Sequence, residues 1–412
     1  MSKTFCPLPW MHLGTHPHGG VTPCCISDMT AGKNRARNFT EQGDKFFNLN
    51  DHSIDTHMNS DYFKQIRLEM LNDQEPLACR RCYAEERKGI TSKRQHEATI
   101  FESYTSDYAR RLTAKDGSID MDLRFVELRL GNVCNIRCRT CNPASSSRWV
   151  ADYKKIVESL DFVNDGYSWL DHKHDFQWPE DENFYEDLYN CAPNMEVLYI
   201  NGGEPTLIKA HWKYLRKLVD SGRSKNIILW YNINMTNLPE EAIPLWKEFK
   251  EARVCPSIDD FDHRNKYIRF PTEWSDVTKN LDAIKDIPEL TVRITQTVSA
   301  YSYAYLDTFL KWAPVPVDMN FVYDPDYLSP AVLPPVVRYE IHEKYRKTMG
   351  NDYHLGTLLS MYNNDIWDET KWEHFCRYND ELDKIRKHEQ GWRQVFPELI
   401  ELCEKHDIKH RY

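Results

Sequence analysis

Short apolar runs alternate with amphipathic segments through the middle of the chain. The apolar runs predict buried strands over 123–130, 195–200, 226–233, 252–258, 290–298 and 317–323. Between them, residues 207–220, 239–251, 273–286 and 303–313 have the apolar spacing of helices. Strands separated by single helices predict right-handed βαβ units and a parallel sheet. Because there are six such strands, we predict an α/β fold with a partial (β/α)6 TIM-like barrel.

The two flanks of this region have different patterns. Prolines and glycines in residues 1–30 indicate a hairpin or loop, 60–72 has the spacing of a helix, and a polar helical stretch follows over about 83–113. Residues 337–412 are helical in pattern, and the acidic, aromatic segment 161–190 interrupts the strand–helix alternation as an insertion. We therefore predict a small N-terminal module over 1–100, the barrel over 101–336 and a helical C-terminal extension over 337–412.

Composition and charge narrow the class of protein. The 412 residues are 41% hydrophobic and include 12 Trp, 23 Tyr and 17 Phe, enough to bury a sizeable core. The net charge of −10, with no basic block, argues against a nucleic-acid backbone as the partner. No run approaches 18 apolar residues, so we expect no membrane span. The N-terminus lacks the apolar run of a secretory signal, and we expect a cytoplasmic protein.

Twelve cysteines are many for a chain expected in a reducing compartment, where clustered thiols indicate metal binding or catalysis. Eight fall within the first 141 residues, and the other four are isolated. Of the isolated four, Cys255 stands two residues before Ser257 in a predicted strand, so both side chains face the same way. We interpret Cys255 as a small buried hydrophobe; the alternative is a thiol that donates a hydrogen atom to a substrate radical.

Two motifs in the predicted barrel carry the chemistry. Cys134, Cys138 and Cys141 form C-x3-C-x2-C in a loop after a strand, a spacing that suits zinc or an iron–sulfur cluster. A closed zinc site needs a fourth ligand, and the next ten residues offer none. About sixty residues later, another strand ends in Gly202-Gly203-Glu204-Pro205, where glycines let the backbone approach a ligand closely.

Together these motifs resemble the radical SAM enzymes. The resemblance implies a [4Fe–4S] cluster on Cys134, Cys138 and Cys141, whose open iron chelates S-adenosylmethionine (SAM). It implies that the GGEP motif meets the amino group of SAM, with Glu204 pairing with the ammonium. Weaker matches in 230–237 and 256–260, and a downstream arginine, add further candidate SAM-binding residues: Asn234, Thr236, Ser257, Asp259 and Arg269. The chain departs from the family pattern at Thr140, where an aromatic residue is common, and at Asp260, where glycine is usual.

A second group of cysteines precedes the predicted barrel. Cys6, Cys24, Cys79 and Cys82, with Gly19 in a G-x4-C hairpin, resemble the auxiliary-cluster module called SPASM, or its shortened form twitch. No further cysteine follows the C-x2-C closely, which favours twitch and a second, auxiliary [4Fe–4S] cluster. Cys25 is the rival of Cys24 as a ligand, and a structural zinc site is the alternative to the cluster.

The resemblance implies an enzyme, a radical SAM oxidoreductase that cleaves SAM to a 5′-deoxyadenosyl radical and abstracts a hydrogen atom from a substrate. A flavodoxin- or ferredoxin-type protein would donate the electron. The expected substrate is a peptide or protein side chain, and the auxiliary cluster would relay an electron in an oxidation or cross-link. A dehydrogenase or epimerase of a small carbinol or sugar-like molecule is one alternative. Another, from a different class, is a non-catalytic iron–sulfur or zinc-binding protein.

Overall fold

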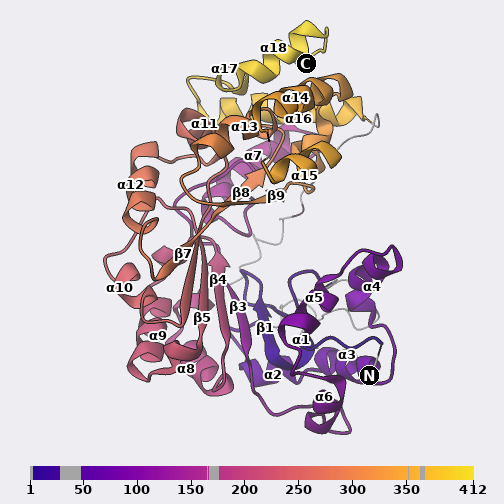
Figure 1. The fold of residues 1–412 in the computed structure, drawn as a ribbon, viewed down its shortest axis with the longest axis vertical. Coiled ribbons are helices and arrows are strands. Elements are labelled where there is room, and N and C mark those ends of the chain that lie inside the picture. Colours follow the sequence, from indigo (N-terminus) through magenta and orange to yellow (C-terminus); the bar gives the residue numbers. More distant parts are fainter. Residues whose placement is uncertain (1–2, 28–47, 165, 167–175, 351, 362–366) are drawn as a thin grey trace. The chain divides into compact units, whose positions relative to one another are not determined.

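The computed structural model describes residues 3–27, 48–164, 166, 176–350, 352–361 and 367–412 (Figure 1). The chain forms two compact units. The first, here called the sheet unit, comprises residues 1–133, 170–231 and 241–252. The second, called the C-terminal unit, comprises 134–169, 232–240 and 253–412. None of the described helices is both long and apolar enough to cross a membrane.

A mainly parallel set of strands forms the framework of the sheet unit. Its strands are β1 (His12–Thr15), β2 (Val21–Thr22), β3 (Phe125–Leu130), β4 (Val197–Gly202) and the start of β5 (Ile228–Ile233). β3 pairs in parallel with β4, and β4 with β5. β1 and β2 form an antiparallel hairpin, as predicted, and β1 also pairs in parallel with β3. The N-terminal hairpin is thus an extension of the same sheet, a connection that the sequence pattern did not reveal.

The two faces of these strands differ in polarity. Val126, Leu128 and Leu130 alternate on one face of β3 and are each 0% exposed. Glu127 and Arg129 lie on the other face, where they form an ion pair at 3.6 Å. On neighbouring strands this second face carries Tyr199, Asn201 and Trp230, all partly exposed. The sheet unit therefore has one apolar, covered face and one polar face.

Helices cover the apolar face of the sheet unit. Figure 1 shows α8 and α9 beside β4 and β5, and the indole of Trp212 on α9 stacks on Tyr231 with ring centroids 6.1 Å apart. The helices of this unit are α1 (Leu8–Met11), α2 (Ile54–Met58), α3 (Asp61–Leu71), α4 (Arg80–Arg87), α5 (Lys93–Ile100), α6 (Ser106–Leu112), α8 (Glu182–Cys191), α9 (Lys209–Asp220) and α10 (Ala242–Trp246).

Two helix predictions need correction. The polar stretch 83–113 is not continuous but contains parts of α4, α5 and α6. Gly89, at φ +74°, follows the end of α4, and the side chains of Ser92 and Thr105 cap the starts of α5 and α6. The helix expected over 239–251 is only the five-residue α10, which contains Pro244.

The C-terminal unit is mostly helical. Its helices are α7 (Val150–Ser159), α11 (Asp262–Ile268), α12 (Trp274–Ile284), α13 (Leu306–Trp312), α14 (Pro335–Thr348), α15 (His354–Ser360), α16 (Glu369–Arg386), α17 (Trp392–Val395) and α18 (Pro397–Lys405). The end of β6 (Glu251–Pro256), β7 (Leu290–Val292), β8 (Ile294–Val298) and β9 (Val317–Phe321) are its strands, with β8 parallel to β9. The strand predicted over 290–298 is interrupted at Arg293, because its N–H bonds Val254 whereas that of Ile294 bonds Pro316.

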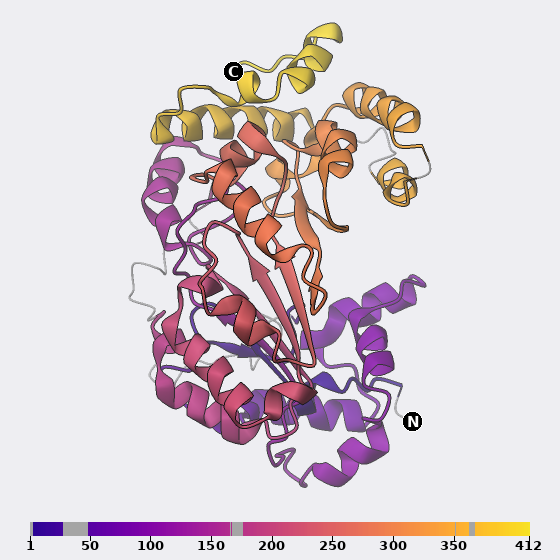
Figure 2. The same ribbon diagram turned by 60° about the vertical axis from the view of Figure 1, so that its left-hand side comes forward.

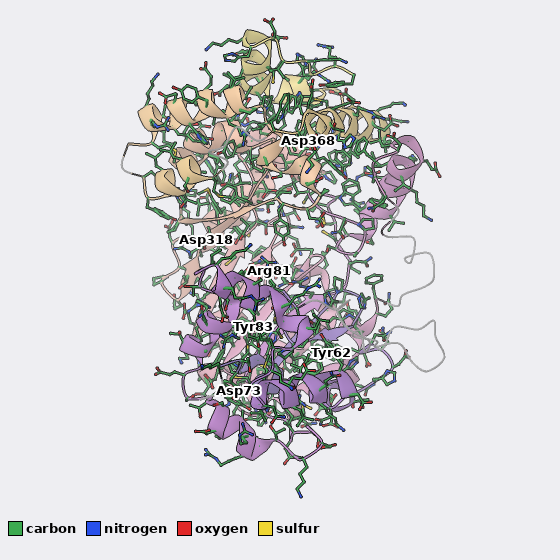
Figure 3. All side chains as sticks on the ribbon, turned by 90° about the vertical axis from the view of Figure 1, so that its right-hand side faces the viewer. Tyr62, Asp73, Arg81, Tyr83, Asp318 and Asp368 are labelled. Atoms are coloured by element: carbon green, nitrogen blue, oxygen red, sulfur yellow. The ribbon has the colours of Figure 1, made fainter. Side chains whose placement is uncertain are left out.

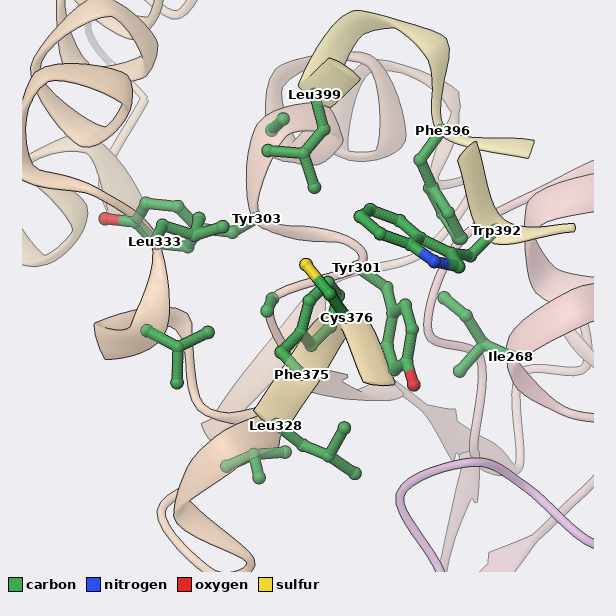
Figure 4. Close-up of a cluster of buried hydrophobic side chains, with 14 of the residues drawn as sticks. Ile268, Tyr301, Tyr303, Leu328, Leu333, Phe375, Cys376, Trp392, Phe396 and Leu399 are labelled. Carbon is green, nitrogen blue, oxygen red and sulfur yellow. The ribbon is translucent and has the colours of Figure 1, made fainter. Parts of the chain in front are cut away.

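The C-terminal helices, orange to yellow in Figure 2, contribute side chains to a core rich in aromatic residues. Tyr301, Phe375, Trp392 and Phe396 are each fully buried there, and the ring centroids of Phe375 lie 5.2 Å from those of both Tyr301 and Trp392 (Figure 4). Because Phe375 comes from α16, Trp392 from α17 and Phe396 from just before α18, the extension 337–412 is packed into this unit.

The predicted insertion, 161–190, lies partly outside the described residues. Its described C-terminal part forms a short 3-10 helix at Trp178–Glu180 and then α8. Trp178 is 0% exposed and its Nε1–H donates to the carbonyl of Pro17 at 2.9 Å. This part of the insertion therefore supports the N-terminal hairpin.

Candidate functional site

The loop that carries Cys134, Cys138 and Cys141 is fixed through its backbone. The N–H groups of Arg137 and Arg139 donate to the carbonyls of Phe270 and Ile268 at 2.6 and 2.7 Å. The N–H of Cys141 donates to the carbonyl of Cys138 at 3.0 Å. Trp149 donates from Nε1 to the same carbonyl at 2.7 Å. These backbone and indole hydrogen bonds therefore fix the path of the loop.

The thiols of Cys134 and Cys138 lie near enough to that of Cys141 to act on it electrostatically. Burial raises the pKa of Cys141 far above its usual value, and the neighbouring thiols of Cys138 and Cys134 raise it further. Burial also raises the pKa of Cys138, against which the Arg269 guanidinium acts in the opposite direction. Such thiols become good ligands when a metal centre takes over their negative charge.

Charged side chains within the triplet loop anchor it to the C-terminal helix α16. Arg139 is 0% exposed, donates to Asn379 Oδ1 at 2.9 Å and forms an ion pair with Asp383. Its guanidinium also lies 3.7 Å from the ring centroid of Tyr267. Nothing in the local sequence identifies Asp383 as a partner, because it stands 244 residues further along the chain.

Arg137 of the same loop forms a second anchor. Arg137 pairs with Asp152 of α7 at 2.8 Å. The other carboxylate oxygen of Asp152 accepts from Arg386 of α16, also at 2.8 Å. The C-terminal extension therefore supports the triplet loop at two points.

Asn135, also within the triplet loop, binds two of the residues predicted to contact SAM. Its Nδ2 donates to Thr236 Oγ1 at 2.7 Å, and its Oδ1 accepts from Asn234 Nδ2 at 2.8 Å. Thr236 Oγ1 in turn donates to Asn234 Oδ1 at 2.6 Å, which closes a ring of three side chains. Met235 between them has φ +60°, a left-handed conformation that bulky residues rarely adopt. Asn234 and Thr236 are thus joined directly to the cysteine loop.

The predicted residues around β6 form a buried ion pair near the thiols. Arg269, 9% exposed, donates from Nη1 to Asp259 Oδ2 at 3.1 Å, and its charge acts on the thiols of Cys134 and Cys138. Asp259 Oδ1 accepts the N–H of Thr297 at 2.9 Å. Ser257 is partly exposed, and its N–H donates to Ile233 O at 2.7 Å. Cys255 is buried at 5% exposure.

In the sheet unit, the GGEP motif follows β4 and packs against the end of β3. The N–H of Gly203 donates to Gly131 O at 3.1 Å, and that of Glu204 to Val133 O at 2.8 Å. A Cβ on Gly203 would lie 2.2 Å from Val133 O, so only glycine fits. Val133 is the residue directly before Cys134 in the chain.

Glu204 and its neighbours complete this turn. Glu204 is 1% exposed, and its Oε1 accepts from the N–H and the hydroxyl of Thr206 at 3.1 and 2.8 Å. Gly202, at φ +129°, has a conformation that L side chains rarely adopt, and Pro205 is buried at the start of a 3-10 helix. The carboxylate of Glu204 is therefore held in one orientation by its own turn.

The four N-terminal cysteines of the sheet unit share one pocket. Cys6, Cys24, Cys79 and Cys82 line it together with Leu8, Ile26, Ser27, Met70, Arg81, Lys93 and Arg94. Burial raises the pKa of Cys24 to about 12, and burial with the nearby thiols of Cys24, Cys6 and Cys82 raises that of Cys79. Cys25 does not line the pocket and is exposed. The geometry favours Cys24 over Cys25 as the fourth member of this set.

Two helices begin at this pocket. Cys79 is the N-cap of α4, Cys82 lies in its first turn, and Lys93 is the first residue of α5. Figure 3 shows Arg81 and Tyr83 on α4. The partial positive charge of a helix N-terminus stabilises a nearby thiolate.

The spacing of the thiols bears on the choice between zinc and a cluster. Within the described ranges, no three or more His, Cys, Asp or Glu side chains surround a common point where one metal ion would bind. A zinc site would need its thiolates about 2.3 Å from one ion. A cubane cluster offers each thiolate its own iron and fits thiols that line a wider pocket.

Comparison with known proteins bears on the N-terminal part of the chain. Residues 6–83 match the SPASM family, an iron–sulfur cluster-binding domain. This match confirms the predicted resemblance of the segment to an auxiliary-cluster module. No curated protein matches the chain.

Solved structures give weaker likenesses. anSMEcpe with bound AdoMet is 17% identical, with 60% of this chain and 64% of that chain covered and a TM-score of 0.37. The chain thus spans less than two thirds of anSMEcpe. SuiB of Streptococcus suis is 13% identical, with 77% and 72% covered and a TM-score of 0.36. SuiB bound to its precursor peptide SuiA is 12% identical, with 82% and 68% covered and a TM-score of 0.32. At TM-scores below 0.5 a likeness does not establish a shared fold.

Sequence reasoning missed several residues that support these sites. Asn135 and Arg139 lie inside the triplet motif, so their position was a usable signal. Lys93 stands eleven residues after Cys82 in a predicted helical stretch without a motif. Asp152, Asn379 and Asp383 carry no sequence signal, because only the fold brings them to the loop.

Proposed function

We propose that this protein is a radical SAM enzyme built on a partial (β/α)6 barrel, with an auxiliary [4Fe–4S] cluster in its N-terminal module. One observation carries the proposal: the backbone of Gly203 and Glu204 is bonded to Gly131 and Val133, immediately before the triplet. A cysteine loop that only bound a structural metal would not need a glycine pair and a buried carboxylate held at its first residue.

The residues present fit the groups that this function requires. Cys134, Cys138 and Cys141 would hold a [4Fe–4S] cluster, which when bound would supply the electron for reductive cleavage of SAM to methionine and a 5′-deoxyadenosyl radical, the species that would abstract a hydrogen atom from the substrate. Glu204, oriented by Thr206, would pair with the SAM ammonium, and the backbone of Gly202 to Pro205 would bind beside it. In this proposal the ring of Asn135, Asn234 and Thr236 positions the SAM-binding strand ends relative to the cluster loop.

The other predicted residues have positioning roles in the proposal. Arg269 balances the negative charge of the three thiolates, and Asp259 orients Arg269. Ser257, partly exposed at the end of β6, would bind SAM directly. In the proposal, the barrel would orient both reactants and exclude water, which otherwise quenches a carbon radical.

The N-terminal module suggests the type of outcome. With four thiolates from Cys6, Cys24, Cys79 and Cys82, an auxiliary cluster has no open iron for a substrate. Its most direct use is to accept the electron that a product radical loses, as a proton leaves and a new bond forms. We therefore propose an oxidation or cross-link of a peptide or protein side chain, with a cytoplasmic flavodoxin- or ferredoxin-type donor.

Anaerobic reconstitution tests the proposal directly. The wild type should bind about eight irons per chain, at four per cluster, and should form 5′-deoxyadenosine from SAM with dithionite. Cys138→Ala should lose 5′-deoxyadenosine formation and about half of the iron, whereas Cys376→Ala, a buried cysteine of α16, should keep both. Retained SAM cleavage in Cys138→Ala would refute the assignment.

A further inference from the structure

Basic side chains surround the N-terminal thiol pocket. Arg81, Lys93 and Arg94 all line it. Each of them has a carboxylate partner. Arg81 pairs with Glu85 at 3.0 Å, Arg94 bonds Glu86 and donates to the carbonyl of Phe5 at 2.8 Å, and Lys93 pairs with Glu97 at 2.7 Å. The charge of Lys93 acts on the thiol of Cys24, and that of Arg94 acts on the thiol of Cys6.

Lys93 has a defined position. Ser92 caps α5 through a capping box, which fixes the backbone at Lys93. Its ammonium lies 2.7 Å from Glu97 Oε1, one helical turn further, and the Glu97 side chain is only 6% exposed. Apart from other cysteines, Lys93 is the charged side chain that acts most strongly on the thiol of Cys24. The ion pair therefore holds the ammonium of Lys93 in place, and Lys93 lines the pocket.

A cation at this position changes the energetics of reduction. A [4Fe–4S]²⁺ core with four thiolates has a charge of −2, and one added electron makes it −3. A nearby positive charge stabilises the more negative state, more strongly in a partly buried site than in water. Cluster potentials depend on such local charge and on solvent exposure.

We propose that Lys93 is a positioning residue that raises the reduction potential of the auxiliary cluster, so that this cluster accepts an electron readily. The inference rests on the proposed function only in assuming that Cys6, Cys24, Cys79 and Cys82 bind an iron–sulfur cluster. It adds that Glu97 acts in the opposite direction, because its carboxylate partly neutralises the ammonium.

The test uses the full chain with Cys134, Cys138 and Cys141 replaced by Ala, which leaves the N-terminal site alone. Dithionite titration followed by EPR measures the midpoint of the [4Fe–4S]²⁺/⁺ couple. Lys93→Met should lower the ratio of reduced to oxidised cluster about tenfold at a fixed potential, equivalent to about 59 mV for one electron. Lys93→Arg should restore the midpoint, and Glu97→Gln should raise it.

Lys88→Met is the matched control, because Lys88 is exposed just after α4, outside the pocket lining. Equal midpoints for Lys93→Met and Lys88→Met would overturn the inference. So would equal shifts in Lys93→Met and Lys93→Arg, which would indicate packing rather than charge. Zinc in place of iron would overturn the inference together with the auxiliary cluster. A wild type that fails to cleave SAM would refute the radical SAM proposal alone and leave the Lys93 result intact.

Discussion

Asp383 on α16 is the position where the C-terminal extension should matter most to the triplet loop. Its Oδ1 accepts from Arg139 and, at 2.5 Å, from the hydroxyl of Tyr267, while Oδ2 accepts the N–H of Trp392 at 2.9 Å. Asp383→Asn preserves the shape of the side chain and removes its charge. The substitution therefore isolates the electrostatic part of the contact.

The expected loss in the free energy of unfolding follows from the burial of Arg139. Its side chain is 0% exposed, so without Asp383 its charge faces the neutral Asn379 and the rings of Tyr267 and Tyr301. Breaking a buried ion pair by removing one partner typically costs about 3–5 kcal/mol, because the remaining charge is uncompensated. The cation–π contact retains about 2 kcal/mol of stabilisation at a desolvated site. We therefore expect Asp383→Asn to lower the free energy of unfolding by about 3 kcal/mol, at the lower end of this range.

Urea denaturation of the reconstituted full chain, followed by circular dichroism, measures this loss, and iron analysis measures its effect on the cluster. Glu373→Gln is the control on the same helix, since Glu373 and Arg377 form a half-exposed pair worth about 0.3–0.5 kcal/mol. Asp383→Asn should also lose the SAM-dependent change in the cluster spectrum while keeping the N-terminal cluster. If Asp383→Asn were as stable as Glu373→Gln with full iron content, α16 would not support the loop.

Three further predictions concern other parts of the molecule. Cys24→Ala should lose about four irons, whereas Cys25→Ala should keep about eight; the reverse would make Cys25 the ligand. Gly203→Ala should retain both clusters and abolish the effect of SAM on the EPR spectrum, because its Cβ would lie 2.2 Å from Val133 O; an unchanged spectrum would contradict this. Burial lowers the pKa of His211 to about 3 from 6.5, so its neutral form stabilises the fold above pH 6.5 and this contribution is lost as the pH falls toward 3. His211→Asn should therefore flatten the pH dependence of stability by about 1.4 kcal/mol per pH unit between pH 6 and 4, and an unchanged slope in urea titrations would show that His211 is already protonated in the fold.

The strands and the cysteine sets were predictable because their signals are local. The apolar run at 123–130 and the alternation within 226–233 depend on residues adjacent in sequence, and β3 and β5 lie within them. Gly203 was also a local signal, since a glycine pair after a strand indicates close backbone approach. The two-residue spacing of Cys79 and Cys82 likewise indicates a pair of ligands, and this pair lies at the start of α4.

The other features of the fold and of the site depended on contacts that sequence spacing does not encode. Nothing near residues 12–15 indicates that they pair with β3, more than 100 residues away. Arg139 and Asp383 are ordinary charged residues until the fold buries them together. The pattern 239–251 predicted a longer helix than α10, because apolar spacing alone does not register Pro244.

The two thiol sets differ in the charge that surrounds them, and the difference suggests a direction for electron flow. In the C-terminal unit, Arg139 pairs with the partly exposed Asp383 and Arg269 with the buried Asp259, so the charge near the triplet is largely compensated. In the sheet unit, Lys93 is likewise paired with Glu97, and the N-termini of α4 and α5 add positive potential at the other four thiols. A cluster in compensated surroundings remains a strong reductant, as SAM cleavage requires. A cluster in positive surroundings is the better acceptor, and this is the property that the proposed role of the N-terminal module requires.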